Sequence, residues 1–290
     1  MQLLKNIVNN GLIVLGLSSG LMVSALAAIA VEPPSFEEWL SAQDDSYKYA
    51  AAEAAIADAE ADIADAMLAA QLDFSELDAD TVKMYADIGN AVAQYNLGMI
   101  YSEGEGVRQD YTQARQWYEK AAKQGNSDAQ NNLGVIYSKG QGVRQDYKIA
   151  AEWYEKAAKQ GDAIAQSNLG VMYEKGQGVR QDYTQARQWY EKAAKQGDAK
   201  AQSNLGVMYS EGHSVRQDHN QARQWYEKAA KQGNAIAQSN LGIMYEIGEG
   251  VRENRATAKE WFGKSCDNGY QKGCDSYRRL NQKQAVIKSK

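Results

Sequence analysis

The sequence predicts an all-α protein built from repeated antiparallel helix pairs, and three observations support this prediction. The segment GVRQDYTQARQWYEKAAKQG occupies residues 106–125 and returns unchanged at 178–197, with close variants at 142–161 and 214–233. The resulting period of 36 residues is typical of helical repeat arrays. The chain has only two prolines, Pro33 and Pro34, so none interrupts a helix in the repeated region. Runs rich in Val, Ile and Thr, which would favour strands, are missing.

Each repeat contains two helical patterns, illustrated by residues 126–161. Asn126 is the predicted N-cap of the first helix and Asp146 that of the second. Apolar residues recur on one face of the first helix at Ala129, Leu133, Ile136 and Tyr137. They recur on one face of the second helix at Ala150, Trp153, Tyr154 and Ala157. Glycines at 140 and 142 end the first helix, and Gly161 ends the second.

Stacking of the pairs is the expected source of the core. One helix pair cannot bury its Trp and Tyr side chains alone, so neighbouring pairs must cover them. Small residues, such as Gly134, lie where the helices must approach closely. We expect the repeated tryptophans to be core residues, with carbohydrate stacking as the alternative. These are Trp117, Trp153, Trp189, Trp225 and Trp261.

The repeat pattern AQxNLGxxYxxGxGVxxDYxxAxxWYxKAAxxG resembles the Sel1-like repeat, a relative of the tetratricopeptide repeat. The resemblance covers five units, at residues 90–125, 126–161, 162–197, 198–233 and 234–269. It implies a right-handed α-solenoid that acts as an adaptor and holds a protein or peptide partner on its concave face.

The candidate binding residues lie on the first helix of each repeat, which lines the concave surface in such solenoids. Each first helix carries an unchanging Asn before Leu-Gly, preceded by a variable residue. The candidates are Tyr95 and Asn96, Asn131 and Asn132, Ser167 and Asn168, Ser203 and Asn204, and Ser239 and Asn240. Amides can both donate and accept hydrogen bonds, so this row suits the backbone of an extended peptide. The alternative is that each Asn satisfies a neighbouring helix of the same chain.

The ends of the chain predict export and capping. Residues 1–30 have one lysine, an apolar stretch and small residues at their end, as in a signal peptide; an uncleaved membrane anchor is the alternative. Residues 31–89 are expected to form an acidic, Ala-rich helical N-terminal cap, and residues 270–290 a C-terminal capping helix and tail. We therefore expect a periplasmic or secreted protein, and a monomer, with membrane contact only through an uncleaved N-terminal segment.

Cys266 and Cys274 are the only cysteines. In an oxidising compartment a disulfide is the leading interpretation and two free thiols the alternative. The resemblance to cysteine-rich secreted Sel1-type proteins also implies that the pair joins the last two helices. A metal site is not expected, because the only histidines, His213 and His219, lie far away in sequence and no CxxC occurs. In the second and third repeats these positions hold Gln and Tyr. The two histidines are interpreted either as sequence drift in a surface loop or as a functional pair that binds a metal or senses pH.

Charge and motifs narrow the function classes. Residues 31–90 carry a net charge of −13, and residues 91–290 a net charge of +7 that is spread through Glu/Lys-mixed helices. This distribution does not favour nucleic-acid binding. The serine-enzyme signature S-x-x-K with S-D-N and K-T-G is absent. We expect a non-enzymatic scaffold without a cofactor. The alternatives are a β-lactam-binding or β-lactamase-like enzyme, as associated with cysteine-rich relatives, and a membrane-tethered spacer.

Overall fold

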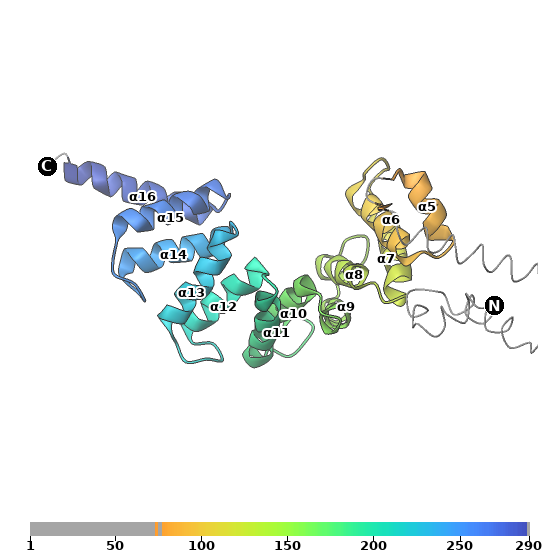
Figure 1. The fold of residues 1–290 in the computed structure, drawn as a ribbon, viewed down its shortest axis with the longest axis horizontal. Coiled ribbons are helices and arrows are strands. Elements are labelled where there is room, and N and C mark those ends of the chain that lie inside the picture. The colour runs from red at the N-terminus through yellow and green to blue at the C-terminus, as the bar shows by residue number, and fades with distance from the viewer. Residues whose placement is uncertain (1–72, 75–76, 289–290) are drawn as a thin grey trace, which may run out of the picture. The chain divides into compact units, whose positions relative to one another are not determined.

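The described part of the chain is entirely helical. The computed structural model describes residues 73–74 and 77–288, and this part contains twelve helices, α5–α16, and no strand (Figure 1). The predicted signal segment and most of the predicted N-terminal cap lie outside the described residues. No helix in 77–288 is both long enough and apolar enough to cross a membrane. The proposed domain limits at residues 30, 89 and 269 stay predictions.

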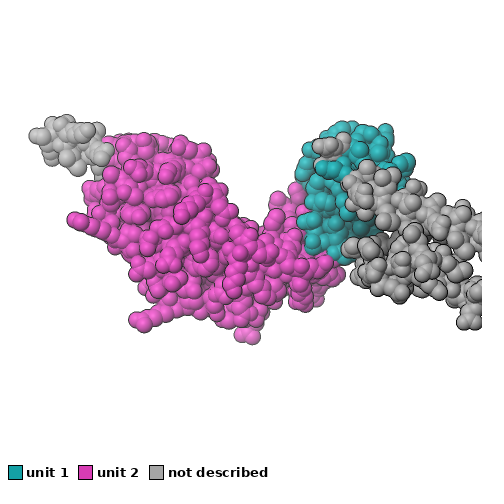
Figure 2. Space-filling model, in the orientation of Figure 1, with its two compact units in different colours: residues 1–129 teal, residues 130–290 magenta. Residues whose placement is uncertain are grey.

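The chain divides into two compact units, residues 1–129 and residues 130–290 (Figure 2). The helices of unit 1 are α5 (Ala79–Asp87), α6 (Ala91–Glu103) and α7 (Tyr111–Lys123). Helix α8 (Ser127–Lys139) contains the boundary. Unit 2 contains α9 (Tyr147–Lys159), α10 (Ala163–Lys175), α11 (Tyr183–Lys195), α12 (Ala199–Glu211), α13 (His219–Lys231), α14 (Ala235–Ile247), α15 (Arg255–Asp267) and α16 (Gln271–Lys288).

The helices pack as consecutive pairs. We call the first helix of each repeat the A helix (α6, α8, α10, α12, α14) and the second the B helix (α7, α9, α11, α13, α15). Within unit 2, α10 packs on α11, α12 on α13 and α14 on α15, and each of α9, α11 and α13 also packs on the A helix that follows it. In unit 1, α6 packs between α5 and α7. The prediction of an α-solenoid of helix pairs is confirmed.

The predicted helix caps are present. One carboxylate oxygen of Asp146 accepts hydrogen bonds from the backbone N–H groups of Lys148 at 2.9 Å and Ile149 at 3.1 Å. The side-chain oxygen of Asn126 accepts from the N–H of Ala129 at 2.7 Å. Gly161 has a φ of +100°, a backbone conformation that favours glycine. Local polar residues therefore start each helix of this repeat, as the sequence indicated.

Each A helix touches its B helix at a glycine. A methyl group added at Gly134 would lie 2.5 Å from the ring of Tyr154, and one added at Gly170 would lie 2.5 Å from the ring of Tyr190. The same position in α14, Gly242, would place it 2.7 Å from the Phe262 ring. These distances are far below a van der Waals contact, so only glycine allows the two helices to come this close.

The expectation that all the tryptophans are core residues is wrong in part. Trp117 is buried, but Trp153, Trp189, Trp225 and Trp261 are only partly buried. The fully packed aromatic is instead the next residue along each B helix: Tyr118, Tyr154, Tyr190, Tyr226 and Phe262. One residue along a helix turns the side chain by about 100°, which moves the indole to the edge of the core.

A lysine ammonium lies over the indole of each B helix, three residues further along that helix. In unit 2 the distances to the ring centroid are 3.9 Å for Lys156 and Lys192, 4.0 Å for Lys228 and 4.4 Å for Lys264. This cation–π contact occupies the space above the ring. It therefore competes with the stacking of a sugar.

The last repeat is closed by covalent and ionic contacts. Cys266 of α15 and Cys274 of α16 form the disulfide that the sequence predicted. Arg279 of α16 makes a two-pronged ion pair with Glu246 of α14, at 2.5 and 2.6 Å. Helix α16 thus takes the place of a further A helix against α15.

We predict that Gly170→Ala destabilises the array by about 1–3 kcal/mol, because the added methyl overpacks the contact with the Tyr190 ring. The denaturation midpoint measured by circular dichroism should fall accordingly. Gly263→Ala is the matched control, since its methyl would lie 3.4 Å from Tyr277, an ordinary contact distance. There we expect no loss, and a gain of up to about 1 kcal/mol from helix propensity. Equal midpoints for the two variants would contradict the close contact.

We also predict that removal of the disulfide loosens α16. A short disulfide-closed loop contributes about 2–3 kcal/mol by the loop-entropy estimate. Hydrogen exchange in Cys266→Ser/Cys274→Ser should therefore speed up in α16, while α10–α12 keep their protection. Reduction of the unmodified protein should give the same pattern. Unchanged exchange in α16 would show that its packing alone holds it.

Candidate partner-binding surface

Four positions of each A helix form one exposed stripe. The second, sixth, ninth and thirteenth residues are spaced i, i+4, i+7 and i+11, which places them on one side of a helix. We call the stripes of α10, α12 and α14 together the A face of unit 2. Its residues are Ile164, Asn168, Val171, Lys175, Lys200, Asn204, Val207, Glu211, Ile236, Asn240, Ile243 and Ile247, all at least partly exposed. A column of amides thus runs between aliphatic side chains.

The structure separates the predicted binding residues into two groups. Asn96, Asn132, Asn168, Asn204 and Asn240 are partly exposed. The residues before them in α8, α10, α12 and α14 are buried: Asn131, Ser167, Ser203 and Ser239. These four point toward the neighbouring helices because they lie one residue, about 100°, away from the Asn column. We therefore remove them from the candidate contact surface.

In unit 1 the candidates Tyr95 and Asn96 are both partly exposed. The Tyr95 ring lies 6.0 Å from that of Tyr118, and the Asn96 side chain donates to the carbonyl of Val92 at 2.9 Å. Both of these contacts lie within unit 1.

The asparagines of unit 2 also contact neighbouring helices. Asn168 donates to the side-chain oxygen of Asn131 at 3.2 Å and accepts from the ammonium of Lys200 at 3.0 Å. Asn204 has a hydrogen bond with Tyr190 of α11. This bond opposes the two effects that raise the pKa of Tyr190, which are burial and the charge of Glu174. The asparagines therefore do contact neighbouring helices of the same chain, the alternative that the sequence left open, and they are also partly exposed.

A row of buried glutamines was not predicted from the sequence. Gln166, Gln202 and Gln238 are buried, and each donates to a carbonyl of the preceding B helix, at 3.1 to 3.2 Å. Their side-chain oxygens accept, at 2.9 Å, from the residue that ends the next B helix: Gln196, Gln232 and Asn268. Both glutamines recur in the repeat, in AQxNLG and AAKQG, and that recurrence was the available signal.

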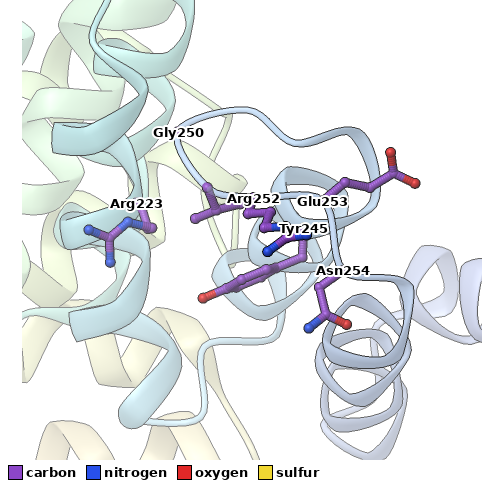
Figure 3. A pocket seen from close by; sticks show the side chains of 7 residues that line it. Arg223, Tyr245, Gly250, Arg252, Glu253 and Asn254 are labelled. Atoms are coloured by element: carbon purple, nitrogen blue, oxygen red, sulfur yellow. The ribbon is translucent and has the colours of Figure 1, made fainter.

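A solvent-open pocket of about 630 Å³ lies where the loop before α15 approaches α13 (Figure 3). It is lined by Arg223, Tyr245, Gly250, Val251, Arg252, Glu253 and Asn254. Arg223 also pairs with Glu227 of its own helix at 2.6 Å. The lining offers charged and amide groups but no serine, cysteine or histidine for nucleophilic chemistry.

The two histidines contact different segments: His213 contacts α11, and His219 contacts the loop between α14 and α15. The His213 ring stacks on Tyr183 with centroids 4.6 Å apart, and His219 Nδ1 lies 3.6 Å from a carboxylate oxygen of Glu249. Ser214, which replaces a glycine of the other loops, has a φ of +60° and lies 3.1 Å from the Thr184 hydroxyl. In the described residues, no three His, Cys, Asp or Glu side chains are grouped to hold a metal.

Paired helices with an exposed face repeated every 36 residues define a helical repeat protein. The Sel1 repeat family model matches residues 91–126, 127–162, 163–198, 199–234 and 235–270. The chain belongs to the Sel1 repeat family. Proteins of this fold are generally protein-interaction scaffolds.

Two crystal structures show the same fold. One is c5321, a protective antigen present in uropathogenic Escherichia coli strains, with 42% identity over 68% of this chain and a TM-score of 0.64. This chain covers 42% of that protein, so it spans about two fifths of its length. The other is a Sel1 repeat protein from Oxalobacter formigenes, with 36% identity, a TM-score of 0.63, and coverage of 65% of this chain and 75% of the other. A search of curated proteins found no match.

The buried tyrosines predict a loss of stability at high pH. Burial is the main reason why the pKa values of Tyr190 and Tyr226 lie above the ordinary value of 10. The unfolded chain releases these protons near pH 10, about the ordinary value, whereas the folded protein holds them, so stability falls as the pH rises beyond that point. We expect the urea midpoint of Tyr190→Phe/Tyr226→Phe to fall less than that of the unmodified protein between about pH 9 and pH 11. Parallel pH curves for the two proteins would contradict this assignment.

Proposed function

We propose that this protein is an exported, non-enzymatic scaffold that binds a protein or peptide partner along the A face of unit 2. The observation that carries the proposal is the exposed amide column, which places the same side chain at the sixth position of successive A helices. Asn168, Asn204 and Asn240 are each partly exposed and lie one repeat apart.

The chemistry of the column suits peptide backbone. A side-chain amide has two donors and an oxygen that can accept twice, so an asparagine that contacts a neighbouring helix can still pair with an N–H or C=O group of a partner. The aliphatic side chains on both sides, such as Ile164 and Ile243, offer apolar contact at 58% and 44% exposure. A partner can therefore gain hydrogen bonds and apolar burial from one surface.

Export is supported by two features of the chain. Residues 1–30 have the pattern of a signal peptide, and Cys266 and Cys274 are joined in a disulfide, which persists in oxidising compartments. The similarity to a protective antigen also favours a location outside the cytoplasm.

We expect the double variant Asn168→Ala/Asn204→Ala to weaken partner binding about thirtyfold, since two lost hydrogen bonds contribute about 2 kcal/mol together. The full chain would be used as bait against envelope and host-surface extracts, and the affinity of a retained partner measured by calorimetry. Asn220→Ala on α13 is the matched control, because this exposed side chain lies outside the A face. Full binding by the double variant, with its helicity intact, would refute the proposed surface.

A further inference from the structure

One cation interrupts an exposed aliphatic column. The second residues of α10, α12 and α14 are Ile164, Lys200 and Ile236, at equivalent positions of successive A helices. The two isoleucines are 58% and 49% exposed. The column therefore presents an exposed apolar group, then an ammonium group, then a second exposed apolar group.

Among the residues that the structure describes, the Lys200 ammonium has no contacting counter-ion. Its contact is with a neutral group, the side-chain oxygen of Asn168 at 3.0 Å, and none of the ion pairs in this part of the chain includes Lys200. Partial burial lowers the pKa of Lys200 below its ordinary 10.5 and the charge of Lys175 lowers it further, while Asp198 acts in the opposite direction. A carboxylate that reached this site would therefore stabilise a partly desolvated charge on an exposed side chain.

The spacing of the column selects a backbone conformation for its ligand. Packed helices lie about 8–10 Å apart, and α10 contacts α12 as α12 contacts α14. A polyproline II peptide advances about 3.1 Å per residue with three residues per turn, so its i, i+3 and i+6 side chains face one side about 9 Å apart. In a β-strand, residues i and i+3 face opposite sides. The backbone of the polyproline II form makes no internal hydrogen bonds, which leaves it free to pair with the adjacent asparagines.

We propose that the partner segment is an acidic peptide in polyproline II conformation, with the order aliphatic-x-x-(Asp/Glu)-x-x-aliphatic. The acidic side chain pairs with Lys200, the aliphatic side chains contact Ile164 and Ile236, and the peptide backbone pairs with Asn168, Asn204 and Asn240. This inference rests on the proposed function and specifies the chemistry of the partner.

The test is a selection of random displayed peptides on the immobilised full chain, followed by fluorescence anisotropy with synthetic peptides. We expect an enriched acidic residue with aliphatic residues three positions before and after it. A Leu-Pro-Ser-Glu-Pro-Ser-Leu peptide should bind at least about tenfold more tightly than the same peptide with Lys in place of Glu. Lys200→Glu should reverse this preference.

Lys195→Glu on α11 is the matched control, because it makes the same charge change on an exposed B-helix residue outside the A face. It should keep the preference for the Glu peptide. An equal effect of both lysine variants would show that net charge alone decides binding, and would overturn the inference.

The remaining outcomes separate the two proposals. Selected peptides that need Asn168 and Asn204 but show no acidic residue would overturn this inference and leave the proposed function standing. Failure to select any peptide that depends on the A face would overturn this inference, and the partner-binding test of Asn168→Ala/Asn204→Ala would then decide the proposed function separately. If the unmodified chain is a dimer that Lys200→Glu dissociates, the occupant of the face is a second copy, and the peptide inference is wrong.

Discussion

The contact between an A-helix glycine and a B-helix aromatic ring is the constraint on which each repeat depends. The Tyr154 and Tyr190 rings lie where a methyl group of Gly134 or Gly170 would be, so the two helix axes approach as closely as backbone allows. Because the glycine side of the A helix packs against the B helix, the side that carries Asn168 faces solvent in part. The exposed column is therefore a geometric result of the closest contact in the repeat.

The buried glutamines set the register that the glycine contact leaves free. A glycine–ring contact is apolar and tolerates sliding, whereas Gln166 must satisfy a carbonyl of α9 and the side chain of Gln196 together. A buried amide without its partners costs about 1–3 kcal/mol, so a shift of either helix is penalised. Close packing and polar satisfaction thus act on different degrees of freedom: the first sets separation and the second sets position along the axis.

Features that depend on residues close together in the chain could be predicted from the sequence. Features that depend on which helix packs alongside could not. The caps at Asp146 and Asn126, the helix pairs and the cysteine pair follow from residues near one another in the chain. The burial of Ser167 beside the partly exposed Asn168 depends on which helix lies across from each, as does the partial exposure of Trp189 beside the buried Tyr190. The significance of Lys200 was out of reach for the same reason, since its contact lies 32 residues away on α10.

The glutamine hydrogen bonds also limit how the number of repeats can change during evolution. Gln196 and Gln232 each pair with a glutamine 30 residues earlier and with a glycine carbonyl 35 residues earlier. Loss or gain of one whole 36-residue period within 162–233 therefore presents every donor with an equivalent acceptor, whereas a deletion that removes one member of a pair leaves a buried amide unmatched. We expect a chain that differs by one whole period in this region to keep its glutamine pairs and its fold. A whole-repeat change thus lengthens or shortens the A face of unit 2 by one A helix.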